Sequence, residues 1–120
     1  MERQIILGRL AFIKYLFSHA DELSKLPEPL NAAALLTYHD AIELFLQLSV
    51  EEVTTQKTTD EISFIGYWKE LTPALEKLGK SGLTQKESMT RLKDARKYLK
   101  HHGTRPSKSD IDYFRIISNT

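Results

Sequence analysis

Residues 35–50, LLTYHDAIELFLQLSV, carry the clearest helical pattern of the 120-residue chain. Side chains that can pack recur at steps of three or four, as on one stripe of an α-helix. The stripe continues past residue 50 to Val53, and its members are Leu35, Tyr38, Ile42, Phe45, Leu46, Ser49 and Val53. Asp40, Gln47 and Glu51 gather on the opposite arc. The pattern predicts the longest helix of the protein over residues 30–57.

The segment before this stretch repeats the same logic. Its apolar stripe predicts a helix over residues 3–25. The stripe consists of Ile6, Leu10, Ile13, Phe17 and Ala20. Pro27 and Pro29 follow and cannot continue a helix, because proline lacks the backbone N–H and clashes with the preceding turn. The first two helices are therefore joined by a short proline-containing connection.

The segment after this stretch begins with polar, β-branched residues 54–59, which we expect to form a loop. A third helix is predicted over residues 61–78, and Pro73 should kink or split it. Its stripe is Phe64, Trp68, Leu71, Leu75 and Leu78. Residues 79–82, Gly-Lys-Ser-Gly, form a predicted turn.

The last third of the chain contains signals for two more helices. Thr84 and Glu87 have the spacing of a capping box, so a fourth helix should start near residue 85 and end at Gly103. It would bury Met89, Leu92, Ala95 and Leu99. Ser107 or Ser109 can cap a last helix, which would run through Tyr113, Phe114 and Ile117. The pattern predicts an all-α protein, an antiparallel bundle of four to five helices.

Length and composition fit one domain over residues 1–120, either complete at Thr120 or the N-terminal part of a longer protein. Seventeen Lys and Arg against sixteen Asp and Glu give a net charge of +1, so any anion site must be local. There is no cysteine, no apolar leader and no run long enough to span a membrane. We therefore expect a cytoplasmic protein without a membrane partner.

The most basic part of the chain is its fourth predicted helix. Eight cationic or titratable groups lie within fifteen residues, and they are Arg91, Lys93, Arg96, Lys97, Lys100, His101, His102 and Arg105. Cations in a last turn complement the negative end of a helix dipole, which is one interpretation. Arginine with histidine also suffices for metal-free RNA cleavage: histidine moves a proton near neutral pH and arginine holds the phosphate.

This stretch resembles a known family. Arg96 followed by His101 matches the Arg-x4–6-His motif of HEPN domains, and so does Arg96 with His102. Residues 103–110, GTRPSKSD, and residues 36–48, LTYHDAIELFLQL, resemble stretches of uncharacterised bacterial HEPN-like proteins. HEPN domains are helical bundles, commonly dimeric. Many are metal-independent endoribonucleases of bacterial toxin–antitoxin or other defence systems.

The resemblance implies roles for particular residues of this chain. Arg96 with His101 or His102 would be catalytic, and no metal or other cofactor would take part. Asp40 or Glu43 would be the supporting polar residue that the family often carries on an earlier helix. The cations near the motif, Lys97, Lys100 and Arg105, would bind RNA. The expected partners are RNA, a second copy of the chain, and an antitoxin or other defence protein.

Helical geometry constrains this site. Residues five apart on an ideal helix point about 140° apart, and residues six apart about 120°. Arg96 therefore does not share a face with His101 or His102. Either the helix loosens near Gly103, or a second subunit supplies the missing group.

Three other interpretations compete. The domain could be a non-catalytic module that dimerises or binds RNA or a partner protein. A DNA-binding domain is disfavoured by the near-zero net charge and the lack of a helix-turn-helix pattern. A metal site at His39 and Glu43, four residues apart, has no identifiable third ligand, and a histidine at the edge of the core is the simpler interpretation.

Overall fold

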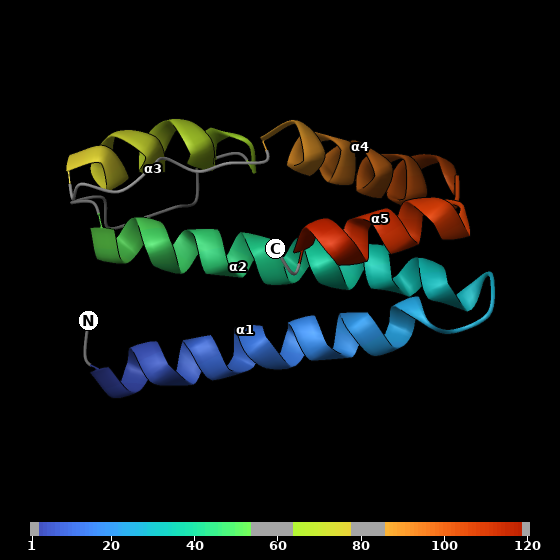
Figure 1. The fold of residues 1–120 in the computed structure, drawn as a ribbon, viewed down its shortest axis with the longest axis horizontal. Helices are drawn as coiled ribbons and strands as arrows, with labels where there is room; N and C mark the ends of the chain where they lie inside the picture. Colours follow the sequence, from blue (N-terminus) through green and yellow to red (C-terminus); the bar gives the residue numbers. More distant parts are fainter. Residues whose placement is uncertain (1–2, 54–63, 78–85, 119–120) are drawn as a thin grey trace.

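A computed structural model describes residues 3–53, 64–77 and 86–118. The described residues form five α-helices and no strand, which confirms the all-α prediction (Figure 1). The α-helices are α1 (Arg3–Ser24), α2 (Ala33–Val53), α3 (Gly66–Lys77), α4 (Lys86–His102) and α5 (Lys108–Ser118), and a short 3-10 helix (Leu30–Ala32) leads into α2. None of the helices in these ranges is long and apolar enough to cross a membrane.

The central element is α2, which contacts each of the other four α-helices. It runs antiparallel to α1, while α3 and α4 lie on the opposite side of it and α5 runs antiparallel to α4 (Figure 1). Its buried side chains are Ala34, Leu35, Tyr38, His39, Ala41, Ile42, Leu46, Leu48 and Val50. A helix buried on so much of its circumference has to be covered from several sides, and the remaining helices therefore assemble around α2.

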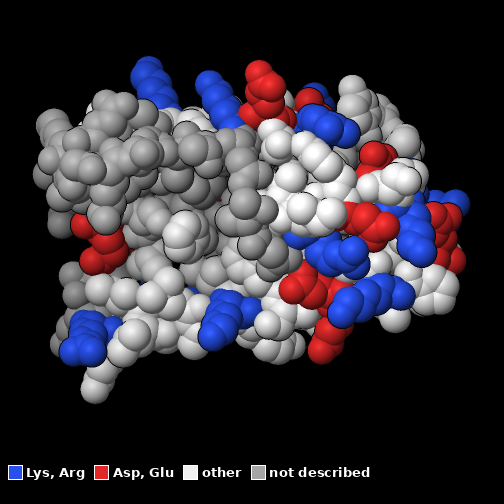
Figure 2. Space-filling view, in the orientation of Figure 1, with Lys and Arg blue, Asp and Glu red and all other residues white. Residues whose placement is uncertain are grey.

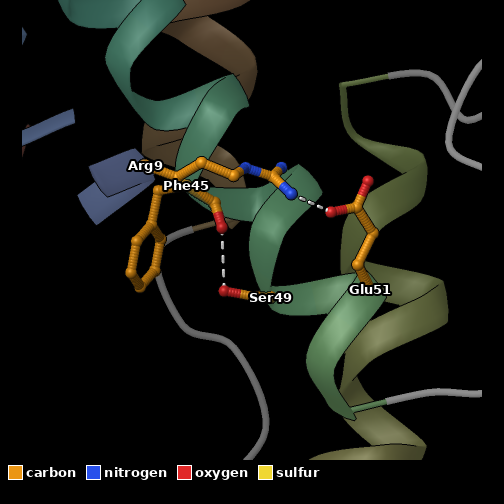
Figure 3. A network of polar contacts seen from close by, with 4 residues as sticks. All are labelled: Arg9, Phe45, Ser49 and Glu51. Carbon is orange, nitrogen blue, oxygen red and sulfur yellow. Dashed lines mark hydrogen bonds and ion pairs between the residues drawn. The ribbon is translucent and has the colours of Figure 1, made fainter. Parts of the chain in front are cut away.

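Polar contacts join α1 to α2 at two levels. Arg9 of α1 forms an ion pair with Glu51 near the end of α2 (Figure 3). Toward the other end of the pair, the hydroxyl of the fully buried Tyr38 donates a hydrogen bond to Asp21. Burial and this bond to a carboxylate both raise the pKa of Tyr38. Together the two contacts set the register of the α1–α2 pair.

The helix ends follow the predicted signals where they lie in the described ranges. Gly103 ends α4 with a φ of 67°, in the left-handed region that favours glycine, and its N–H donates to the carbonyl of Leu99. Ser107 caps α5, because its Oγ accepts from the N–H of Asp110 at 3.1 Å while the Asp110 carboxylate accepts from the N–H of Ser107 at 3.4 Å. The predicted loop at 54–59, the turn at 79–82, Leu78 and Thr84 lie outside the described residues.

Two expectations about burial are wrong, and one of the two effects expected of Pro73 does not occur. Phe45 and Leu10 were expected in the core but are exposed, Phe45 by 44%. Phe45 lies in the second half of α2, whereas α5 covers the first half and ends there (Figure 1). Pro73 does not split α3, which continues to Lys77. Because Pro73 has no N–H, it cannot donate a hydrogen bond to the carbonyl of Lys69. Lys69 is exposed, so water can donate this hydrogen bond instead.

Candidate functional site

Arg96 of α4 faces Asp40 of α2. Its Nη2 atom lies 4.0 Å from the Asp40 Oδ1 atom, and the Arg96 side chain is 31% exposed. The Nε atom of the guanidinium is buried and has no hydrogen-bond partner among the described residues. Asp40 thus lies at ion-pair distance from one end of the guanidinium, and the exposed part of the Arg96 side chain is left for a further acceptor.

His39 lies beside this pair and is 4% exposed. Its ring stacks on Phe64 with 4.2 Å between ring centroids, and its Nδ1 atom has no hydrogen-bond partner in the described part of the chain. Burial, together with the positive charges of Arg96 and Lys100, lowers the pKa of His39 to about 4. His39 is therefore neutral at pH 7, so it adds no third positive charge beside the two cations.

His101 and His102 form the last turn of α4, and both are exposed. The ring of His102 lies against the exposed ring of Tyr98, at 5.9 Å between centroids. Among the described residues, no ion pair or ring contact joins either histidine to Arg96. The α-helix stays regular through His102 and ends only at Gly103, so it does not loosen between the arginine and the histidines.

The structure places the other predicted site residues around this end of the bundle. Lys97, Lys100 and Arg105 are exposed. Glu43 is half-buried on α2, and among the described residues it forms no ion pair with Arg96. Basic and acidic side chains interleave over the end of the molecule where the α1–α2 and α4–α5 connections lie (Figure 2). Of the two supporting carboxylates predicted, Asp40 is the one that faces Arg96.

Sequence reasoning did not include two residues in the site. His39 was weighed with Glu43 as a metal site and was interpreted more simply as an edge-of-core histidine, without a role beside Arg96. Its burial could have been inferred from Ala41 and Leu48, which extend the apolar arc of α2 beyond a single stripe and indicate a helix covered on several sides. Tyr98 was overlooked because a lone tyrosine in a basic helix carries no spacing signal. Its exposed ring beside His102 is visible only in three dimensions.

Comparisons with known proteins give no match. No protein-family model matches the chain, and neither a curated protein nor a solved structure matches it. Among the described residues, no group of three His, Asp or Glu side chains is arranged to hold a metal ion. The case for a function therefore depends on the side chains at the end of α4 and the residues of α2 that face them.

Proposed function

We propose that this protein is a HEPN-like, metal-independent endoribonuclease. Arg96 is the phosphate clamp, and His101 or His102 is the general acid and base. The position of Arg96 carries the proposal: its side chain is 31% exposed, and its Nη2 atom lies 4.0 Å from the Asp40 Oδ1 atom, at the limit of an ion pair. Arginine in this position presents a planar fork of donors that matches two oxygens of one phosphate.

The reaction needs only groups that the RNA and the protein supply. The 2′-hydroxyl of a ribose attacks the adjacent phosphorus, and a histidine accepts the hydroxyl proton. The bond from phosphorus to the 5′-oxygen of the next nucleotide breaks, and that oxygen receives a proton from a protonated histidine or water. Arg96 stabilises the charge that develops on the phosphoryl oxygens.

Several side chains near Arg96 suit an RNA strand. Lys97, Lys100 and Arg105 are exposed cations that can neutralise phosphates. Tyr98 is 53% exposed and lies against His102, so the two rings offer a surface on which a base can stack. This combination of cations and an exposed aromatic is typical of single-strand binding without strict sequence preference.

A second copy of the chain completes the site in this proposal. Arg96 faces α2, and the histidines project from the exposed end of α4 in other directions, so one chain does not converge them on one phosphate. A two-fold axis near this end would bring the histidines of one protomer to the arginine of the other. The resemblance to HEPN domains further suggests that the protein acts in a bacterial cytoplasm and that its partner is an antitoxin or another defence protein.

The test is cleavage of a mixed structured RNA in EDTA, with folding verified by circular dichroism. We expect the wild type to cut and Arg96→Ala to lose at least about 100-fold in rate, as does the double variant His101→Ala/His102→Ala. Arg96→Lys should recover little, because lysine lacks the bidentate fork. The control is Lys14→Ala, which removes an exposed cation on α1 and should leave the rate unchanged. No cleavage by micromolar wild type would refute the proposal.

A second function is favoured by a different surface, the exposed apolar face of α1. Ile5, Phe12 and Tyr15 are each more than half exposed, and Gly8 lies between them. A cavity of about 310 Å³ on this face is lined by Ile5, Gly8, Phe12 and Leu44, among others. The alternative function is a non-catalytic module that dimerises through this face. Because α1 and α4 lie on opposite sides of α2 (Figure 1), such a dimer would not complete the Arg96 site.

A further inference from the structure

A polar cleft lies where the α1–α2 connection meets the start of α5. One cavity of about 620 Å³ is lined by Lys25, Glu28, Asn31, Lys108 and other residues, and a second of about 250 Å³ shares Glu28 and Asn31 and adds Arg105. We refer to the two adjoining cavities as the Asn31 cleft. Their combined size falls in the range that holds small-molecule ligands.

Asn31 is the unusual side chain of this cleft. The residue is only 2% exposed, yet it lines both cavities. Its backbone N–H donates to the carbonyl of Pro27, but its side-chain amide has no hydrogen bond to any described residue. Among the described residues, the fully buried polar atoms without a partner belong to other side chains, so the Asn31 amide reaches the solvent of the cleft, where a ligand can replace water. An amide of this kind that lines a cavity is well placed to bind a polar ligand.

The charges around the amide indicate the ligand chemistry. Lys25, Lys108 and Arg105 line the cleft, and none of them forms an ion pair with a carboxylate in the described ranges. Three uncommitted cations favour a phosphate group. Arg115 also lines the larger cavity, but its Nη2 atom lies 3.5 Å from the Asp112 Oδ1 atom, so it is already engaged.

Two acidic residues line the cleft, and they narrow the chemical class of the ligand further. Asp112 lines the larger cavity and is paired with Arg115. Glu28 lines both cavities, and its carboxylate would repel a bare polyanion. A carboxylate is also the group that proteins use to accept hydrogen bonds from the hydroxyls of a ribose. A ligand with a phosphate at one end and sugar hydroxyls at the other could place its phosphate beside the cations and its hydroxyls beside the Glu28 carboxylate. Leu26 and Pro27 supply an apolar wall on the larger cavity.

We propose that the Asn31 cleft binds a phosphorylated sugar of up to nucleotide size. Its phosphate lies among Lys25, Lys108 and Arg105, its hydroxyls meet Glu28, and the Asn31 amide bonds to the ligand at the base of the cleft. This site does not include Arg96 and does not depend on the RNA-cleavage proposal, although it shares Arg105 with the cations proposed to bind RNA.

The experiment follows the side-chain NH₂ signals of Asn31 in ¹⁵N-labelled protein by NMR, during titration with ribose 5-phosphate, 5′-AMP and inorganic phosphate. We expect saturable shifts of these signals with ribose 5-phosphate or 5′-AMP, and weaker binding of phosphate alone. The comparison between the two sugar phosphates shows whether the base contributes. Lys108→Gln should weaken binding about tenfold, the usual effect of losing one charge-assisted hydrogen bond. Lys14→Gln makes the same charge change on α1 and should have no effect.

Three results would overturn the proposal. Asn31 signals that do not move at 10-millimolar ligand, on the order of the weakest affinities treated as binding, would show that the cleft holds only water. Equal weakening by Lys108→Gln and Lys14→Gln would indicate general charge attraction. If phosphate binds as tightly as ribose 5-phosphate, the sugar contributes nothing to the affinity and the proposed sugar contacts do not exist. Because Lys108 is exposed, its variant should fold normally and give a clear reading.

Discussion

The environment of His39 makes the stability of the folded protein depend on pH. The imidazole is buried against Phe64, and the charges of Arg96 and Lys100 disfavour its protonation. Its pKa is about 4 in the folded protein, below the ordinary value of 6.5. At a pH between these two values the unfolded chain binds a proton that the folded chain does not, so stability rises with pH across this window. The stability that the protein gains by keeping His39 neutral is fully present above about pH 6.5 and is lost as the pH falls toward 4.

Replacement of His39 by leucine tests this linkage. We expect the free energy of unfolding of the wild type to fall by about 2 kcal/mol more than that of His39→Leu between pH 7 and pH 4.5. Urea denaturation at the two pH values measures both proteins, and the comparison cancels the titration of carboxylates elsewhere. Equal losses in the two proteins would mean that His39 takes up its proton in the folded state as readily as in the unfolded chain.

At the scale of the helices, much of the fold could be predicted from sequence. The period of Leu35, Tyr38 and Ile42, the prolines after α1 and the glycine after α4 are local signals, and local signals depend little on the rest of the chain. The exposure of Phe45 could not be predicted in this way. It depends on which parts of α2 the neighbouring helices cover, and this tertiary arrangement is not encoded by the periodicity within α2.

The apolar face of α1 permits a prediction about assembly. Isolated exposed apolar side chains are ordinary, but Ile5, Phe12 and Tyr15 follow Gly8 or precede it at helical spacing on one face. Ile5, Gly8 and Phe12 also line a surface cavity on that face. If the chain dimerises through this face, Phe12→Glu should convert a dimer to a monomer in sedimentation experiments, because a buried unpaired carboxylate opposes association. Leu30→Glu, at a residue 60% exposed on the 3-10 helix, is the control and should sediment like the wild type. A wild type that stays monomeric at high concentration would show that the face binds no second copy.

At the scale of the whole molecule, the candidate site was only partly predictable. The contact of Arg96 with Asp40 follows from packing α4 antiparallel on α2, and the sequence suggested Asp40 or Glu43 for that position. The sequence could not choose between them, because the choice depends on the rotation of one helix against the other. Helical geometry did predict that Arg96 and the two histidines would diverge, and α4 is regular over this span. The proposal of a shared site follows from that divergence.

The most direct test of the shared site is to mix two inactive variants. One is Arg96→Ala, and the other is His101→Ala/His102→Ala. Each mixed dimer would contain one intact site, with arginine from one protomer and histidines from the other. With random exchange in a two-fold dimer, we expect about a quarter of the wild-type RNA cleavage rate. If the wild type cleaves RNA but the mixture stays as inactive as each variant alone, the arginine and histidine act within one chain and the account of a shared site is wrong.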